Sequence, residues 1–202
     1  MPTITAIKPQ KDKKRVNIYL DGKFGFGIDL GNFVTLGLKV ERELSDKEVE
    51  EIVKKSEFQK TLDKLLRFAT LRPRSEKEIK DWFKRRKVYE SLHKELFKRL
   101  NRLDLIDDTK FAQWWVEQRN SFKPRGKRAL EMELRMKGIK KEVIREVLEE
   151  TEVDKKKIAK ELLDKKSYKW RLLPKREARA KMSAFLARKG FNWEVIEKVL
   201  EK

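Results

Sequence analysis

The fold is decided by a repeated stretch whose clearest copy is GKRALEMELRMKGIKKEVIREVL, residues 126–148. Apolar residues recur in it at the three- and four-residue spacing of amphipathic helices, once before Gly138 and once after it. The same pattern occurs 51 residues earlier and 52 residues later. A period of this length is typical of repeat proteins, which present an extended surface rather than a pocket. The matching positions are Ile79, Phe83, Val88, Leu92, Leu96 and Phe97, then Leu130, Leu134, Ile139, Val143, Val147 and Leu148, then Met182, Leu186, Phe191, Val195, Val199 and Leu200.

The pattern predicts a mainly α-helical protein with three tandem three-helix modules, preceded by a small β-rich unit. We place the N-terminal β-rich extension at 1–44, and a linker helix with module 1 at 45–106. Module 2 then covers 107–151 and module 3 covers 152–202.

Alternating apolar residues predict strands near the N-terminus. Val16–Leu20 and Phe24–Ile28 flank Asp21-Gly22, a pair that favours a type I′ hairpin turn. Thr3–Lys8 is a candidate third strand, and residues 29–44 predict a short helix with a turn at Gly37.

Capping motifs mark where the helices begin. Ser45–Glu48 and Ser75–Glu78 both have the capping-box pattern, in which serine and glutamate satisfy free amides at a helix start. The second box follows Arg72-Pro73-Arg74, which ends the preceding helix, and Pro124-Arg125-Gly126 occupies the equivalent place in module 2.

The composition indicates a polyanionic partner. Lysine and arginine number 53 against 34 acidic residues, a net charge of +19, which suits nucleic acid, a nucleoprotein or an anionic membrane. Cysteine is absent, so disulfides and thiolate metal sites are excluded. Neither an apolar run of membrane-spanning length nor a secretory signal pattern occurs, and we expect a cytoplasmic protein.

The positive charge recurs in the second helix of each predicted module. Arg67–Lys87 holds nine basic and three acidic residues, Lys123–Lys141 eight and two, and Lys165–Lys189 ten and one. If the modules stack regularly, these helices form a positive stripe that binds phosphates. Helix starts at 75, 126 and 177 would add backbone amides that favour anions. The candidate partner- or DNA-binding residues are Arg72, Arg74, Lys123, Arg125, Lys127, Arg128, Arg135, Lys137, Lys175, Arg176, Arg179 and Lys181.

Residues with other chemistry point to packing rather than catalysis. Trp114 and Trp170 could stack on bases, but partial burial against a neighbouring module is the favoured interpretation. His93, the single histidine, aligns with Ile144 and Ile196 and so occupies a packing position. The sequence contains no phosphate loop, metal-ligand spacing or nucleophile elbow, so it predicts no catalytic residues, metal or cofactor.

Several motifs in the correct order resemble the RecX regulatory family. They are Leu71–Ile79 (LRPRSEKEI), Leu105–Ala112 (LIDDTKFA) followed by Arg119, Leu134–Ile139 (LRMKGI) and Phe185–Phe191 (FLARKGF). The resemblance implies three three-helix modules in an elongated curved array. It also implies binding to the RecA filament on single-stranded DNA, with inhibition of RecA ATPase, strand exchange and coprotease activity. The sequence departs from the family pattern at Lys87, where a glycine is expected after the second helix of module 1.

The same sequence features also fit other functions. The first is a basic helical-repeat protein that binds DNA without a recombinase partner. A nuclease and a membrane-surface protein are further alternatives, although no cluster of acidic metal ligands supports the former. We expect an elongated monomer.

Overall fold

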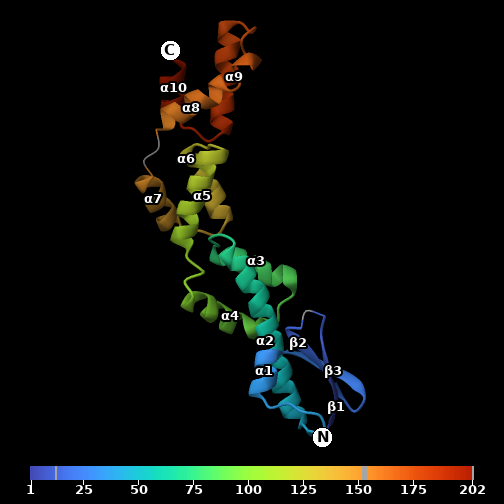
Figure 1. The fold of residues 1–202 in the computed structure, drawn as a ribbon. Coiled ribbons are helices and arrows are strands. Elements are labelled where there is room, and N and C mark those ends of the chain that lie inside the picture. The colour runs from blue at the N-terminus through green and yellow to red at the C-terminus, as the bar shows by residue number, and fades with distance from the viewer. Residues whose placement is uncertain (12, 152–153, 202) are drawn as a thin grey trace. The chain divides into compact units, whose positions relative to one another are not determined.

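The protein is mainly helical, with a small antiparallel sheet at its N-terminus, as the sequence predicts (Figure 1). The computed structural model describes residues 1–11, 13–151 and 154–201. Their contacts form two compact units. Unit 1 comprises Met1–Leu71 and Lys87–Leu103, and unit 2 comprises Arg72–Arg86 and Asp104–Lys202. The four-part division by repeat modules stays a prediction.

The sheet of unit 1 has the order β1-β2-β3, with β1 Ile4–Pro9, β2 Arg15–Leu20 and β3 Lys23–Asp29. Both pairings are antiparallel, and the candidate third strand is confirmed as β1. Asp21 and Gly22 have φ angles of 49° and 79°. These positive values fit the predicted type I′ turn.

Helices cover one face of this sheet. Helix α1, Leu30–Thr35, is followed by the predicted turn at Gly37, and α2, Asp46–Thr70, contacts β3. Ser45 and Glu48 form the predicted reciprocal capping box of α2. The shared core contains Ile4, Val16, Ile18, Phe26, Ile28, Leu38, Leu44 and Ile52.

Helix α4, Glu90–Arg102, also belongs to unit 1 and buries one side. Leu92, Leu96 and Leu100 are buried at the expected four-residue spacing. His93 lies beside them, half-buried, with its Nε2 atom 3.1 Å from the carbonyl oxygen of Val88. The environment of His93 therefore agrees with a packing role.

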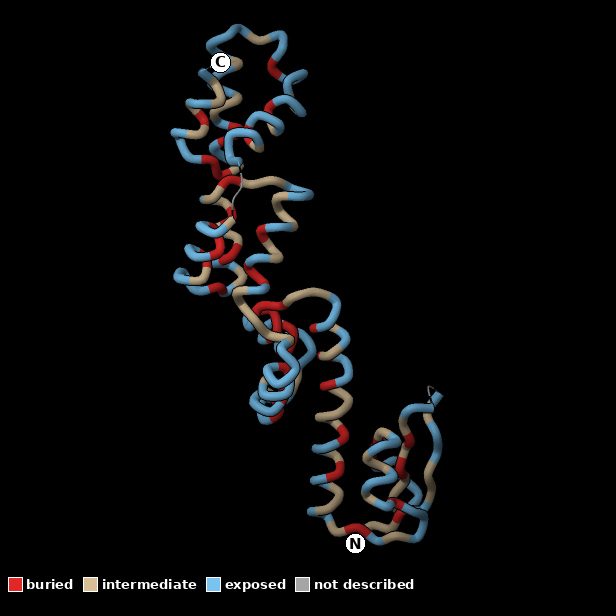
Figure 2. The backbone as a smooth tube through the Cα atoms, turned by 60° about the vertical axis from the view of Figure 1, so that its left-hand side comes forward, coloured by how far each residue is buried: buried red, intermediate tan, exposed pale blue. Residues whose placement is uncertain are grey.

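Unit 2 is helical throughout the residues that the structure describes. Its elements are α3 Glu76–Arg86, α5 Asp108–Phe122, α6 Lys127–Met136, α7 Lys141–Glu150, α8 Lys155–Asp164, the 3-10 helix η1 Ser167–Lys169, α9 Lys175–Arg188 and α10 Trp193–Leu200. Figure 2 shows buried and exposed positions alternating along these helices, as one-sided packing requires.

Each of the last two helical triplets encloses its own core. Helices α5, α6 and α7 bury Phe111, Ala112, Val116, Leu130, Leu134, Ile139, Ile144, Val147 and Leu148. The segment from α8 to α10 buries Ala159, Leu163, Trp170, Phe185, Leu186, Phe191 and Ile196. Trp170 is 7% exposed and packs on Phe185, with ring centroids 5.6 Å apart. Trp170 is therefore buried, as predicted, but in the core of its own triplet rather than partly against a neighbouring module.

The second helices end in a shared backbone conformation. Gly138 and Gly190 follow α6 and α9 with φ angles of 83° and 88°. Lys87, which replaces the corresponding glycine after α3, also has a positive φ, 52°. The helix end is therefore retained, although a side chain is disfavoured in this left-handed region.

Replacing Lys87 with glycine should stabilise the protein by about 1 kcal/mol, because glycine adopts the left-handed conformation without steric cost. Urea unfolding followed by circular dichroism would measure this as a higher midpoint. Lys84→Gly is the control, since Lys84 is exposed within α3 and glycine there should cost about 1 kcal/mol. A lower midpoint for Lys87→Gly would contradict the prediction.

Candidate polyanion-binding surface

Helices α6 and α9 meet end to end. The backbone amide of Gly126 donates to the carbonyl oxygen of Lys189 over 2.9 Å, and that of Arg128 donates to Gly190 over 3.3 Å. The free amides at the start of α6 thus pair with free carbonyls at the end of α9. The positive end of one helix dipole faces the negative end of the other, which favours this contact.

The start of α3 and the end of α6 also meet, and here a side chain makes the hydrogen bond between them. The hydroxyl of Ser75, which precedes α3, donates to the carbonyl oxygen of Lys137 at the end of α6 over 2.9 Å. A Cβ atom on Gly138 would lie 2.7 Å from the Cβ atom of Lys77, so the two helix ends are in close contact. The second helices α3, α6 and α9 are therefore joined in series within unit 2.

These contacts correct the predicted anion sites at helix starts. The amide of Glu76 donates to Asp108, and those of Gly126 and Arg128 donate to α9, so the starts at 75 and 126 are occupied by protein acceptors. The third start was misplaced, because α9 begins at Lys175 rather than at 177. The amides at 75 and 126 are paired within the protein, which the sequence did not predict because periodicity does not reveal which helix ends face each other.

Glu78 gathers three of the predicted cationic residues. Its carboxylate lies 2.9–3.0 Å from the guanidinium of Arg72, 2.8 Å from Nζ of Lys137 and 3.7 Å from Arg74. Burial raises the pKa of Glu78, but hydrogen bonds from Arg72 and Lys137 outweigh it and leave the pKa below its usual value. The serine half of the predicted second capping box is present, because the amide of Glu78 donates to Oγ of Ser75 over 3.2 Å. The carboxylate of Glu78 also joins α3 to the end of α6.

Aromatic rings complete this cluster. The guanidinium carbon of Arg72 lies 4.8 Å from the ring centroid of Trp114, and Nζ of Lys137 lies 4.8 Å from that of Trp115. Such cation–π contacts hold the charged groups against α5. Trp114 is half-buried, as predicted, but it packs against the α5–α7 core of its own triplet rather than against a neighbouring module. Together with the burial of Arg74, this places Arg72, Arg74 and Lys137 largely inside the protein.

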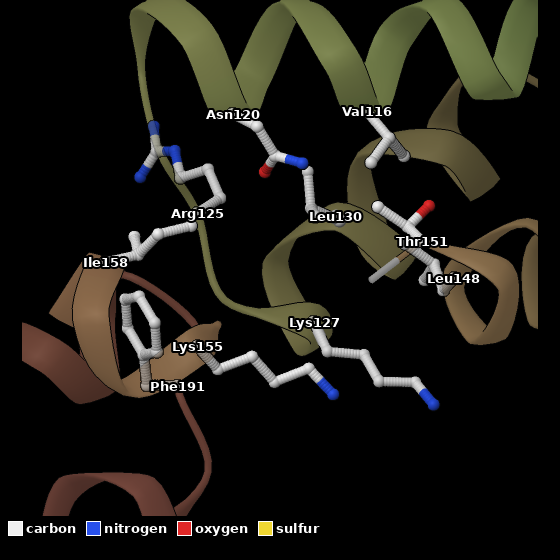
Figure 3. A pocket seen from close by; sticks show the side chains of 10 residues that line it. All are labelled: Val116, Asn120, Arg125, Lys127, Leu130, Leu148, Thr151, Lys155, Ile158 and Phe191. Atoms are coloured by element: carbon white, nitrogen blue, oxygen red, sulfur yellow. The ribbon is translucent and has the colours of Figure 1, made fainter. Parts of the chain in front are cut away.

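Arg125 is likewise engaged inside unit 2. Its Nε atom lies 3.7 Å from the carboxylate of Glu133, which also accepts from Arg119 over 2.7 Å and from the indole of Trp115 over 2.9 Å. Arg125 and Lys127 border a cavity of about 30 Å³, shown in Figure 3. This volume suits about one water molecule and is too small for a nucleotide.

Seven predicted residues have exposed side chains: Lys123, Arg128, Arg135, Lys175, Arg176, Arg179 and Lys181. Two of them make exposed ion pairs, Arg179 with Glu197 at 3.6 Å and Lys181 with Glu177 at 2.7 Å. Exposed ion pairs contribute little and leave the lysine or arginine accessible. These residues, rather than the Glu78 cluster, are available to a polyanion.

A groove of about 360 Å³ brings two of these residues together where α6 meets α9. Arg128 and Arg135 line it from α6 and Arg188 from α9, so three arginines outnumber the single acidic lining residue, Glu131. We call it the α6–α9 groove; the exposed Met132 also borders it. Arg188 is not among the residues predicted from the repeat, because the position 52 residues earlier is Met136 and the repeat does not mark it as basic.

In the described parts of the chain, no group of three or more histidine, cysteine, aspartate or glutamate side chains could hold a metal ion. Among the same residues, no helix is long and apolar enough to cross a membrane.

The chain belongs to the RecX family. The family model described as regulatory protein RecX N-terminal domain matches residues 2–45. The second and third RecX three-helix domains match residues 107–148 and 154–200. The N-terminal strands are thus part of a described RecX domain.

The sequences of individual RecX relatives match this chain along its whole length. Regulatory protein RecX of Bacillus licheniformis is 33% identical over 204 residues, covering 100% of this chain and 78% of the relative. That of Bacillus subtilis is 32% identical, with coverage of 100% and 77%. A crystal structure of regulatory protein RecX has a TM-score of 0.74 at 28% identity and covers 100% of both chains. The family is thus one of regulatory proteins.

Gly126→Ala should weaken the contact between α6 and α9. A Cβ atom there would lie 2.2 Å from backbone atoms of Gly190, which cannot move aside as a side chain could. The φ angle of −74° suits alanine, so crowding alone should cost about 1–3 kcal/mol. Hydrogen exchange should become faster at the Arg128 amide and in α9. Gly31→Ala, which faces a side chain 3.3 Å away, is the control and should leave exchange unchanged.

Glu78→Gln should destabilise the protein at neutral pH by about 2 kcal/mol, because Arg72 and Lys137 lose their buried counter-charge. Since the folded-state pKa lies below the usual 4.5, the carboxylate stabilises the fold above that pH. Its contribution disappears as pH falls through the folded-state value. The difference in unfolding free energy between parent and variant should therefore shrink below about pH 4.5. An equal difference at pH 3 and pH 7 would contradict this, and Glu146→Gln on α7 is the exposed control.

Proposed function

We propose that this protein negatively regulates homologous recombination and DNA repair by binding the RecA filament on single-stranded DNA. On this proposal it inhibits RecA ATPase, strand exchange and coprotease activity. It acts in the cytoplasm as a monomer, without cofactor or catalytic residues. Membership of the RecX family, whose relatives are named regulatory proteins, supports the proposal.

The observation that carries the proposal is the α6–α9 groove. Arg128, Arg135 and Arg188 converge there from two modules, and their side chains are exposed. Arginine pairs well with phosphate and carboxylate groups, so this surface suits a nucleoprotein that offers both. Because several modest contacts lie on one chain, later contacts form intramolecularly and affinity rises with the length of the polymer.

The alternative is direct DNA binding without a recombinase partner. Both functions use phosphate contacts, and the charge of +19 favours either. They differ in one measurable consequence, since only a recombinase regulator should lower RecA-dependent ATP hydrolysis at concentrations where the DNA itself stays available.

The test reverses the charges of the groove. The triple variant Arg128→Glu, Arg135→Glu and Arg188→Glu should lose inhibition of RecA ATPase on single-stranded DNA by at least about 10-fold in concentration, because each contact contributes about 1 kcal/mol or more. Titration at several salt concentrations would measure it. The dependence of inhibition on salt should also become shallower for the variant.

A matched control makes the same charge change elsewhere in unit 2. Lys140→Glu, Lys141→Glu and Arg145→Glu alter exposed residues at and beside α7, next to an acidic segment. This variant should inhibit RecA nearly as well as the parent. If the groove variant inhibits equally well, the α6–α9 groove has no part in the function.

A further inference from the structure

The face of the N-terminal sheet opposite the core carries an exposed aromatic pair. Val16 and Ile18 of β2 point into the core, so Asn17 and Tyr19 point away from it. The register of β2 and β3 shifts between Ile18 and Tyr19, so Tyr19 pairs with Phe24 although Phe26, two residues further on, lies in the core. Tyr19 meets Phe24 edge to face, with ring centroids 6.1 Å apart, and Phe24 is 60% exposed. A large ring held in place and exposed to solvent offers a stacking surface.

Positive charge surrounds this pair. Nζ of Lys8 lies 5.0 Å from the centroid of Tyr19 and covers that ring, which leaves Phe24 as the open one. A groove of about 450 Å³ runs from Phe24 between β3 and α2. Lys60 and Lys64 line it from α2, together with Glu57, which pairs with Lys60 over 3.1 Å and leaves Lys64 as the lysine without an ion pair among the described contacts. Phe24, Gly25, Phe26 and Gly27 line it from β3.

Arg15 lies in this groove with part of its hydrogen-bonding capacity unused. Its Nη2 atom donates to the carbonyl oxygen of Gly27 over 2.9 Å and to the hydroxyl of Ser56 over 2.8 Å. Its Nη1 atom is buried and has no hydrogen-bond acceptor among the described residues. A buried charged donor without an acceptor is costly, and an anionic oxygen entering the groove would remove this cost.

We propose that this surface of unit 1 binds single-stranded nucleic acid, with a base stacked on Phe24 and backbone phosphates in the groove beside Arg15 and Lys64. Aromatic stacking next to a basic groove is the chemistry by which proteins hold single strands without reading sequence. A duplex does not fit, because its bases are already stacked and paired. The inference concerns naked single strands and does not rest on the proposed regulation of RecA.

The test uses the full-length protein and fluorescence anisotropy with two labelled oligomers of about 16 nucleotides, oligothymidylate and an abasic strand of equal length. The parent protein should bind oligothymidylate more tightly. Phe24→Ala should lower that affinity about 10-fold, since one base loses its stacking partner, and should change abasic binding less than about two-fold. Phe24→Trp retains a stacking ring and should bind like the parent.

A charge variant tests the groove separately. Lys64→Glu should weaken binding of both oligomers and reduce the slope of log affinity against log salt by about 0.7, the value for one phosphate contact on a single strand. Lys47→Glu makes the same change on the same helix, 17 residues away, or roughly 25 Å along its axis. Tyr89→Ala removes another exposed aromatic, 70% accessible. Both controls should leave the preference for oligothymidylate intact.

Two results would overturn the inference. The first is an unchanged preference for oligothymidylate in Phe24→Ala, which would exclude stacking on this ring. The second is equal weakening by Lys64→Glu and Lys47→Glu, which would show general charge attraction in place of a groove. The anisotropy experiment contains no recombinase, so neither result bears on RecA inhibition. Conversely, the effect of the α6–α9 groove variant on RecA inhibition does not bear on single-strand binding at Phe24.

Discussion

The contact between successive second helices is the constraint on which unit 2 depends. The amide of Gly126 reaches the carbonyl oxygen of Lys189 at 2.9 Å, a distance that leaves no room for a side chain on either Gly126 or Gly190. The glycine after α9 therefore has two roles. Its positive φ ends the helix, and its missing Cβ lets the next module approach. Each junction joins oppositely charged helix ends, so the series α3, α6, α9 is favoured electrostatically as well as sterically.

The sequence predicted the elements well because periodicity and capping are local properties. Apolar spacing located the helices, Asp21-Gly22 predicted the hairpin, and Ser45 predicted the start of α2. It could not predict partners distant in sequence. Glu78 illustrates this limit, since its capping pattern is local whereas Lys137 lies 59 residues away. Whether a carboxylate caps its own helix or joins another depends on packing that no short motif records.

The same limit explains the uneven result for the candidate site. Counting charges identified the basic second helices but could not separate lysines and arginines that hold modules together from those that face solvent. Arg72, Arg74 and Lys137 were singled out for their place in the repeat, and the structure shows that this place is an internal ion-pair cluster. Arg188 breaks the repeat yet lines the α6–α9 groove. Residues that recur in every module are mainly those that pack the modules together. A binding groove is formed by the side chains that this packing leaves exposed, and these need not recur.

The two proposed surfaces would contribute to binding in physically different ways. Arginines in the α6–α9 groove act through charge, so their contribution falls as salt displaces the ionic contacts. Phe24 acts through stacking on a base, which salt affects little but removal of the base abolishes. Since both surfaces belong to one chain, binding at either raises the effective concentration of the other for the same polymer. A single strand held at Phe24 would therefore occupy the α6–α9 groove more often, although the affinity of that groove for the strand is unchanged. This gain would persist at salt concentrations at which charge alone no longer holds the strand.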